Sequence, residues 1–457
     1  YIFACKGIDL LKPNACLCYI ATNNWVTNDG ASLLRNKIVS DTKIIQLIDF
    51  FDAMIFDSAS IQTMIMLFQK DSITDNYSFD YRKVQQKYAN KQAAINLLKK
   101  IHDDSNVFFM PLINRAHFSN QLLTFASTEN DQILQLISNT THILLNDKEG
   151  VKEISSGIDV LQDYVNKKTQ QILNNKKQIG DGIFVLSQQE YDSLSLNCTE
   201  KELVKPYYTS KLINRYSVCK KNSEWIIYTD SSVNNRISLY PNTQKHLDQF
   251  SKVITSVNKP YGLHRARKKE SFEGEKILAL RKCVNRPAFS YVNFDSFVSR
   301  AYLIIRTNRV NQKYLTGLLN STLIKYWLKY KGKMQGANFQ IDKEPLLHIP
   351  IAVPAINIQE LIATIVDYVM MASSTKENLS GLVSNKTIAL FFEKIIDGCV
   401  YELYFGEHMK EQEINIVDSS LELIKPISQL TTEKDKSEVI LNTFMAIKKT
   451  DNPIRNR

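Results

Sequence analysis

The sequence of 457 residues lacks any long hydrophobic run. No stretch approaches the roughly eighteen uninterrupted apolar residues of a membrane span, and no charged-then-apolar leader opens the chain. Internal repeats and low-complexity tracts are absent as well. The sequence therefore predicts a protein that is neither secreted nor inserted in a membrane, and that has no membrane partner.

Paired cysteines are also lacking. The number of cysteines is odd, and they are scattered through the chain, so neither a disulfide framework nor a zinc knuckle is indicated. Cys16 and Cys18 have no matching second pair and are expected to be small residues on one face of a strand. This number and spacing of cysteines is most typical of a protein in a reducing cytoplasm. The seven are Cys5, Cys16, Cys18, Cys198, Cys219, Cys283 and Cys399.

Basic residues outnumber acidic ones. The chain has 57 Lys plus Arg against 47 Asp plus Glu, a formal net charge of +10, and 44% of its residues are hydrophobic. The length and apolar content are enough for two or three cores. The excess of positive charge favours a polyanionic partner, and nucleic acid before others.

The first 71 residues have the pattern of an α/β sheet. A helix to Leu11 is followed by an apolar strand over residues 17–21, a helix through residues 33–38 that Asn28 or Asp29 can cap, and strands at 44–50 and 61–68. This order is typical of the edge of a doubly wound sheet. The chain opens at Tyr1 inside the first helix, so we expect a further segment upstream.

The rest of the chain divides into three segments that differ in composition and hydrophobic pattern. Residues 72–150 are polar and are predicted to be a helical connector, with Val84, Tyr88, Ile95 and Leu98 on one helical stripe. Residues 151–355 hold short β-type runs such as GIFVLS, EWIIYT and RAYLIIRT, which predict a mixed α/β module. Residues 356–457 are predicted to be a helical segment, with apolar helices at 358–371 and 387–405 and a loosely held charged tail after residue 429.

Two stretches near the start carry a family resemblance. They read LLKPNACLCYIATNNWVTNDGASLLRNKIV and LIDFFDAMIFDSASIQTMIMLFQK. They resemble the second half of the catalytic domain of gamma-class amino-methyltransferases that act on adenine in DNA. The resemblance implies that the chain continues a Rossmann-like methyltransferase sheet, and that Phe56 stacks on a target base swung out of the duplex. Without the resemblance, the sequence would favour Phe56 as a loop hydrophobe folded onto the sheet.

Asn23, Asn24 and Trp25 follow the first apolar strand, where open α/β sheets place their ligands. The asparagines could meet a base edge near the active site or cap the next helix, and Trp25 is expected in the core. The family's cofactor loop and its Asn-Pro-Pro-Tyr catalytic loop are not in this sequence. The resemblance therefore implies S-adenosylmethionine as cofactor of an intact enzyme, with no catalytic or cofactor-binding residue in these 457.

A second resemblance covers residues 150–355. Its marks are VKEISSGIDV, QIGDGIFVLSQQEY, LVKPYYTSKLINRY, WIIYTD, YPNTQKHLDQF, FEGEKILALRK, YLTGLLNSTLIKYWLKYKGK and LHIPI. In this order they resemble the TaqI-like specificity domain, the target-recognition module of such methyltransferases. The resemblance implies double-stranded DNA as partner.

The same module carries the densest basic patterning. Arginine suits bidentate contacts to guanine, lysine suits phosphates, and Gln or Asn can bind adenine edges. Any single cation could instead be a solvated surface residue, and residues 331–338 could be a plain loop that ends a helix. The candidates for DNA contact are Arg265, Arg267, Lys268, Lys269, Arg281, Lys282, Arg286, Lys331, Lys333, Gln335 and Asn338.

These observations give one leading hypothesis and two alternatives. The leading hypothesis is the DNA-recognition part of an adenine-N6 methyltransferase of a bacterial restriction-modification system, cytoplasmic, with Mg²⁺ needed only if a nuclease domain lies upstream. The first alternative is a non-catalytic specificity subunit that positions a separate catalytic chain. The second is a scaffold protein whose C-terminal apolar helices bind a protein partner.

Overall fold

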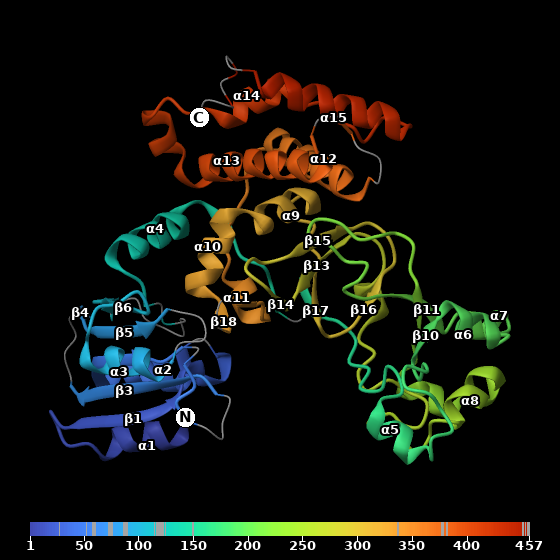
Figure 1. Cartoon of the computed structure of the whole chain (residues 1–457), viewed down its shortest axis with the longest axis horizontal. Helices are drawn as coiled ribbons and strands as arrows, with labels where there is room; N and C mark the ends of the chain where they lie inside the picture. Colours follow the sequence, from blue (N-terminus) through green and yellow to red (C-terminus); the bar gives the residue numbers. More distant parts are fainter. Residues whose placement is uncertain are drawn as a thin grey trace. The chain divides into compact units, whose positions relative to one another are not determined.

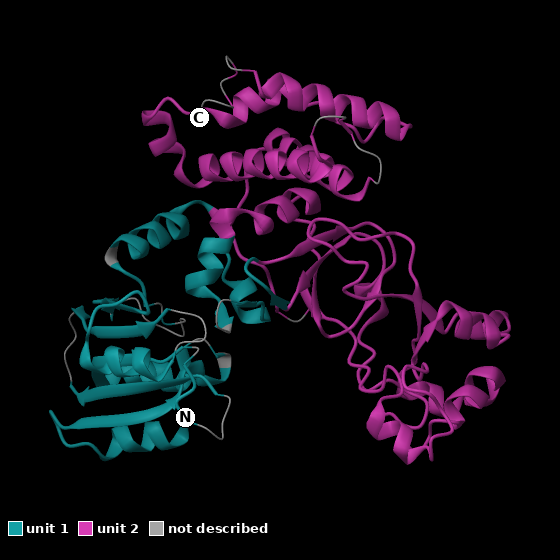
Figure 2. Cartoon of the chain, viewed as in Figure 1, with its two compact units in different colours: residues 1–141, 282–286, 325–350 teal, residues 142–281, 287–324, 351–457 magenta. Residues whose placement is uncertain are grey.

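The computed structural model of the chain (Figure 1) divides into two compact units (Figure 2). Unit 1 contains residues 1–141, 282–286 and 325–350, and unit 2 contains residues 142–281, 287–324 and 351–457. The boundaries of these units differ from those of the four segments predicted from the sequence pattern. We describe each unit separately. The structure describes all residues except 27, 52, 57–60, 72–75, 86–89, 114, 116–122, 124, 149, 336–337, 376–378, 381–382, 450–451, 453 and 455–457.

A five-stranded sheet is the centre of unit 1, in the order β1-β3-β2-β5-β6. Strand β3 is antiparallel to both β1 and β2, β5 is parallel to β2, and β6 is antiparallel to β5. The first three strands lie where the sequence predicted them. The bounds are β1 Cys16–Thr22, β2 Thr42–Asp49, β3 Thr63–Lys70, β5 Asp80–Val84 and β6 Asn106–Phe109.

Helices α1 (Ile2–Leu10) and α2 (Ser32–Asp41) contribute apolar side chains to the core of this sheet. Trp25 is 1% exposed and meets the ring of Phe68 edge to face at 6.2 Å between centroids, so its predicted core position is confirmed. The expected helix cap is wrong, because α2 begins after Ala31 and has no side-chain cap. The guanidinium of Arg35 instead donates to nearby loop carbonyls, including that of Trp25 at 2.8 Å.

The segment expected as an all-helical connector is partly sheet. Val84 ends strand β5 and is fully buried, while helix α3 (Lys91–Lys99) begins only after Asn90, whose side chain accepts from the Ala93 N–H. Tyr88 lies outside the described residues. A helical stripe across residues 84–98 was therefore wrong, because burial between neighbouring strands outweighs the helical spacing at Val84.

Unit 1 is completed by short elements from distant parts of the sequence. A three-stranded sheet, in the order β14-β19-β18, joins residues 282–283 to residues 333–340. Helix α10 begins in unit 2, and its residues 325–331 belong to unit 1. The bounds are β4 Tyr77–Ser78, β7 Leu112–Ile113, α4 Thr128–Asn139, β14 Lys282–Cys283, α10 Thr322–Lys331, β18 Lys333–Gln335, β19 Asn338–Gln340 and α11 Lys343–Leu347.

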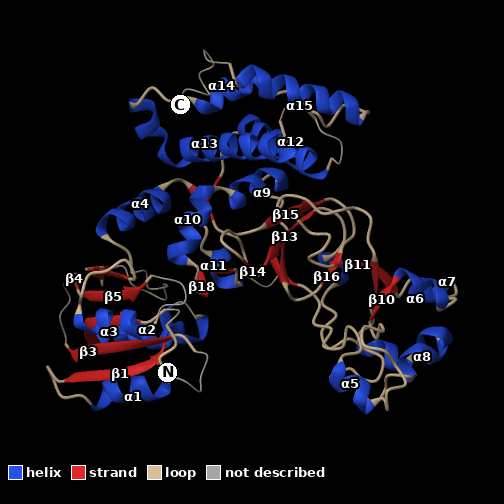
Figure 3. Cartoon of the chain, viewed as in Figure 1, coloured by secondary structure: helices blue, strands red, loops and turns tan. Residues whose placement is uncertain are grey.

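Unit 2 contains two four-stranded sheets, ordered β10-β12-β11-β16 and β15-β13-β17-β9 (Figure 3). They share one core that includes Phe184, Ile226, Leu278 and Phe297. Their strands include the three β-type runs that the sequence predicted. The strand bounds are β8 His142–Ile143, β9 Ile154–Ser156, β10 Val185–Ser187, β11 Val204–Tyr208, β12 Glu224–Ile227, β13 Lys276–Leu280, β15 Phe289–Val292, β16 Phe297–Val298, β17 Tyr302–Ile305 and β20 Ile351–Ala352, and the helices are α5 Lys167–Ile172, α6 Gln188–Ser193, α7 Cys198–Lys201 and α8 Pro241–Asp248.

The C-terminal part of unit 2 is helical, as predicted. Helices α12 (Ile356–Ser374) and α13 (Asn385–Glu411) bury their apolar residues against each other and against α9 (Gln312–Asn320). This packing accounts for the apolar faces that suggested a scaffold protein. The tail is not loose, because α14 (Ile416–Leu423) and α15 (Glu433–Ile447) are formed and α15 buries residues such as Phe444. Among the described residues, each helix is too short or too polar to cross a lipid bilayer.

Candidate functional site

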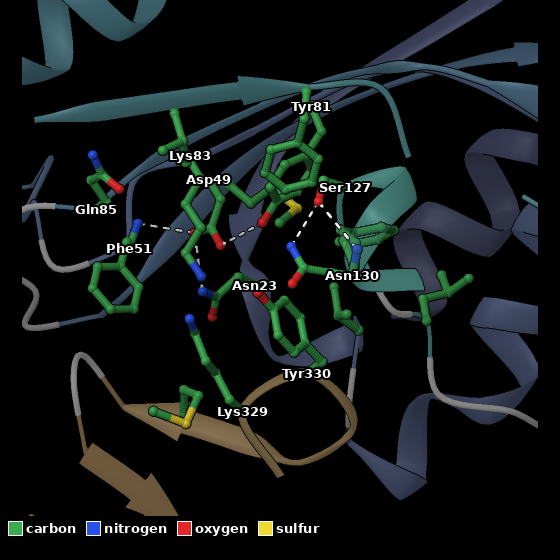
Figure 4. A pocket seen from close by; sticks show the side chains of 18 of the residues that line it. Asn23, Asp49, Phe51, Tyr81, Lys83, Gln85, Ser127, Asn130, Lys329 and Tyr330 are labelled. Carbon is green, nitrogen blue, oxygen red and sulfur yellow. Dashed lines mark hydrogen bonds between the residues drawn. The ribbon is translucent and has the colours of Figure 1, made fainter. Parts of the chain in front are cut away.

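A cavity of about 1000 Å³ lies within unit 1, at the carboxyl ends of β1 and β2. These two strands point the same way, because both are antiparallel to β3. Residues that follow β1 (Asn23, Asn24) and residues at the end of β2 (Asp49, Phe51) line it (Figure 4). This is the edge of an α/β sheet at which ligands bind.

Asp49 organises one wall of the cavity. One oxygen of its carboxylate accepts from the Asn23 amide at 3.2 Å and from the Phe51 backbone N–H at 2.9 Å, and the other accepts from the Tyr81 hydroxyl at 3.2 Å (Figure 4). Asp49 is 5% exposed. Burial, together with the neighbouring Asp49 carboxylate, raises the pKa of Tyr81 well above its usual value. Tyr81 therefore remains a hydrogen-bond donor to Asp49 at neutral pH.

Phe51 adopts a backbone conformation that is rare for its residue type. Its φ angle is +49°, in the left-handed region that favours glycine. The side chain is half-buried, and the Lys83 ammonium lies 4.6 Å from the centroid of its ring. Strained conformations of this kind persist where surrounding contacts enforce them, and they gather at functional sites.

The opposite wall comes from α4 and from residues between 325 and 334, with Phe339. It carries cations and aromatic rings, including Lys325, Lys329 and Tyr330, and the Lys329 ammonium lies 5.2 Å from the Tyr330 ring centroid. The Tyr326 hydroxyl donates to the Asn130 side chain at 2.7 Å, which connects α10 to α4. The cavity therefore combines stacking surfaces with positive charge, the two features that bind bases and phosphates.

Of the residues that the sequence analysis placed near an active site, some line the cavity and one does not. Asn23 and Asn24 both line the cavity, and the Asn23 side chain bonds Asp49 rather than the start of a helix, so the capping alternative is wrong for Asn23. Phe56 is 46% exposed in the β2–β3 connection, and it is not among the described residues that line the cavity. Its base-stacking role stays a prediction.

Six of the eleven predicted DNA contacts belong to unit 1. Lys282 and Lys333 both pair with Gln340, so they lie in one row across the β14-β19-β18 sheet, and Lys333 is 3.6 Å from Asp342. Lys331 is half-buried, and burial lowers its pKa, so it is a weaker candidate for DNA contact than Lys282, which is exposed. The side chain of Gln335 lies outside the described residues. The six are Lys282, Arg286, Lys331, Lys333, Gln335 and Asn338.

The other five belong to unit 2, where contacts with other residues hold the side chains of at least two of them. Lys269 forms an ion pair with Glu273 at 3.0 Å, and the Arg267 side chain donates to the Gly157 carbonyl at 3.4 Å. The cations that looked like one basic cluster in the sequence therefore belong to two different units of the fold. The five are Arg265, Arg267, Lys268, Lys269 and Arg281.

Sequence reasoning missed Asp49, Phe51, Tyr81 and Lys83. Asp49 could have been found, because it ends an apolar strand that is parallel to the strand before Asn23. Tyr81 and Lys83 could not, because residues 72–150 were expected to be helical and β5 lies in that segment.

The described residues provide no evident binding site for a metal ion or cofactor. Among them, no group of three or more His, Cys, Asp or Glu side chains could hold a metal. Gly332 is the one glycine among the described cavity-lining residues, and an added Cβ there would lie 2.4 Å from the Leu328 carbonyl oxygen. Gly332 directly follows α10 and packs against the last turn of that helix, so it makes no open turn, and we assign no contact with S-adenosylmethionine to the cavity.

Two family models match parts of the chain. Residues 1–56 match the Eco57I restriction-modification methylases, and residues 205–351 match the TaqI-like C-terminal specificity domain. Both predicted resemblances are therefore confirmed. The matched specificity segment includes residues 325–350, which share unit 1 with the methylase segment.

A protein of Methanocaldococcus jannaschii, whose assigned name is that of a type II restriction enzyme and methyltransferase, is 27% identical over 245 residues. The match covers 49% of this chain and 19% of that protein. The fold is similar to that of the Type IIL restriction-modification enzyme MmeI, which was solved in complex with DNA. The TM-score is 0.53 at 13% identity, over 94% of this chain and 50% of MmeI. The predicted fold class, a methyltransferase sheet followed by a mixed α/β module and helices, is confirmed.

Proposed function

We propose that this chain is the DNA-recognition part of a restriction-modification methyltransferase, with the end of a methylase fold in residues 1–56 and a TaqI-like specificity domain in residues 205–351. The chain spans only part of each relative's length, so the activity proposed is that of the intact enzyme. That activity is methyl transfer from S-adenosylmethionine to the exocyclic N6 of adenine in duplex DNA, in the cytoplasm. Mg²⁺ enters only if the intact protein also carries a nuclease domain.

One observation carries this proposal. Residues of the methylase match and residues of the specificity match line the same cavity within one compact unit. The methylase match supplies Asn23 and Asp49, and the specificity match supplies Lys329 and Tyr330. A methyltransferase that acts on a base must hold that base beside its catalytic sheet while other residues grip the duplex.

Duplex binding by this chain should weaken steeply with salt. Each neutralised phosphate contributes about −0.9 to the slope of log K against log salt concentration. We expect the double variant Lys282→Ala and Lys329→Ala to reduce the magnitude of that slope by about 1.8, because both side chains are exposed lysines of unit 1. Fluorescence anisotropy with a mixed-sequence duplex at several salt concentrations measures it.

The matched control replaces Lys410 and Lys434 by alanine. Both are exposed lysines on the C-terminal helices of unit 2, outside the specificity match. This control should leave the slope unchanged. Equal slopes for the two double variants would remove Lys282 and Lys329 from the DNA interface, and binding that ignores salt would contradict DNA recognition altogether.

A second test concerns the exposed aromatic residue of the β2–β3 connection. In the intact enzyme, Phe56→Ala should reduce the emission change of a 2-aminopurine at the target position more than Lys331→Ala does. Phe56 is 46% exposed and offers a stacking face, whereas Lys331 is half-buried. Equal effects of the two substitutions would count against a base-stacking role for Phe56.

A further inference from the structure

The cavity of unit 1 carries more positive than negative charge. Four of its described lining residues are lysines, whereas Asp49 is the one carboxylate among them. Both oxygens of Asp49 already accept hydrogen bonds, and all three donors are neutral groups. Asp49 therefore does not neutralise the lysines through an ion pair. The four are Lys83, Lys325, Lys329 and Lys333.

Two of these lysines lie on one face of helix α10. Lys325 and Lys329 are four residues apart, a spacing that places their Cβ atoms about 5 to 6 Å from each other on adjacent turns. Like charges at this spacing repel each other and destabilise the helix. Lysine side chains are long and flexible, so two of them on adjacent turns can bring both ammonium groups to one anion.

This pair of lysines has no acidic partner among the described residues. Lys325 is half-buried and makes no ion pair there, and Lys329 contacts the Tyr330 ring, 5.2 Å from its centroid. Lys333, by contrast, lies 3.6 Å from the Asp342 carboxylate. Placing an ammonium group in a partly buried position without a counter-ion is unfavourable. An anion bound between the two lysines would remove that cost and their mutual repulsion.

A hydrogen bond fixes the lysine-bearing helix beside the cavity. The Tyr326 hydroxyl, next to Lys325, donates at 2.7 Å to the side chain of Asn130 on α4. Asn130 also lines the cavity. Figure 4 shows the Lys329 side chain extending toward Asn23, on the wall formed by the methylase strands. The two ammonium groups are therefore held where a ligand in the cavity can reach them.

We propose that Lys325 and Lys329 form a clamp for a phosphate group of a nucleotide. Each ammonium donates charge-assisted hydrogen bonds to phosphate oxygens, and the phosphate supplies the counter-ion that the pair lacks. The phosphate comes from the backbone of bound DNA or from a free nucleotide. The first source rests on the proposed function, and the second does not.

Phosphorus NMR with deoxyadenosine monophosphate tests the clamp without DNA. The phosphorus resonance of a small ligand broadens when the ligand exchanges with a site on a large chain, so we expect the wild-type chain to broaden it. The double variant Lys325→Gln and Lys329→Gln should weaken binding about tenfold or more, because charge-assisted hydrogen bonds are lost. Inorganic phosphate should displace the nucleotide from the wild-type chain, because the clamp binds the phosphate group.

Two control variants separate the clamp from general charge. Lys410→Gln with Lys434→Gln removes two exposed charges from unit 2 and should leave the broadening unchanged. Lys325→Arg with Lys329→Arg keeps both charges and should retain the affinity within about threefold, since guanidinium groups also bind phosphate.

The clamp is overturned if the wild-type chain does not broaden the resonance. It is also overturned if the glutamine double variant broadens the resonance as much as the wild-type chain does. Circular dichroism checks that the variants are folded. If Lys325→Gln disturbs the fold, Lys329→Gln alone decides the result, because Lys329 is exposed.

Competition with duplex DNA identifies the source of the phosphate. If saturating duplex abolishes the broadening, in step with duplex binding followed by fluorescence anisotropy, the clamp holds the DNA backbone. If the broadening persists in the duplex-bound chain, the clamp holds a free nucleotide. A wild-type chain that binds no duplex overturns the proposed function, while the nucleotide titration still decides the clamp. A chain that binds duplex but not the nucleotide overturns the clamp alone.

Discussion

Replacing Arg215 by alanine is expected to lower the free energy of unfolding of the chain by about 3 kcal/mol. One guanidinium nitrogen of Arg215 donates to both carboxylate oxygens of Glu393, at 2.8 and 2.7 Å, and the group also bonds the Asn320 side chain at 3.2 Å. The side chains of Arg215 and Glu393 are 17% and 13% exposed. Without the cation, a largely buried carboxylate on α13 would have to be accommodated, which is the costly way to break such a pair.

The matched control is Arg300→Ala. Arg300 also pairs with a carboxylate, that of Asp159 at 3.3 Å, but its side chain is 63% exposed, so this substitution should change the free energy by less than about 1 kcal/mol. Guanidinium-induced unfolding followed by circular dichroism measures both. Similar losses for the two variants would show that burial does not set the value of the Arg215 pair.

Gly317→Val is expected to destabilise the chain by about 2 to 3 kcal/mol, because it overpacks a closed helix contact. Gly317 lies on α9, where an added Cβ would be 2.9 Å from a methyl carbon of Ile362 and 3.0 Å from one of Val366. Both neighbours lie fully buried on α12, so they have little room to move. The lost stability should appear as a lower midpoint in the same denaturant titration.

Gly406→Ala serves as the control for this substitution. Gly406 lies in α13 directly after the kink at Phe405, and an added Cβ there would meet nothing within 4 Å. Alanine should therefore change the free energy of unfolding by less than about 1 kcal/mol, because it overpacks nothing and the difference in helix propensity is at most about that size. Unchanged stability in Gly317→Val would contradict the close approach of α9 to α12. An equal loss in Gly406→Ala would show that the loss does not come from that contact.

The candidate site contains residues from both family matches. DNA recognition and base capture are therefore not confined to separate segments of the chain. Lys329 and Tyr330 belong to the specificity match, yet they line a cavity at the end of the methylase strands. Substitutions of Lys329 or Tyr330 are therefore expected to affect base capture as well as duplex affinity. Substitutions of Arg265 or Lys268 in unit 2 should affect duplex affinity alone.

Much of the fold could be predicted from local patterns. Strands β1, β2 and β3 are short apolar runs bounded by polar residues, and α12 and α13 are long stretches with helical periodicity. The local pattern of each segment therefore predicts whether it is a strand or a helix. The segment around Val84 could not be predicted in this way. Its apolar residues fit a helical spacing, and pairing with β2 made it a strand.

The candidate site was predictable only in part. Asn23 and Asn24 follow an apolar strand directly, so their place at the sheet edge could be inferred from their position in the sequence. The partnership of Asp49 with Tyr81 joins residues 32 positions apart. Hydrogen bonds over such separations leave no periodic trace in the sequence, because they depend on which strands become neighbours.

The amino-acid sequence by itself determined the types of most elements, the basic character of the chain and the two family resemblances. Each of these depends on residue identity over short spans. Tertiary structure decided that Asn23, Phe51 and Tyr81 meet at one carboxylate, and that the predicted cations divide between two units. The physical reason is that side-chain chemistry acts over a few ångströms, and only the folded backbone brings distant residues within that range.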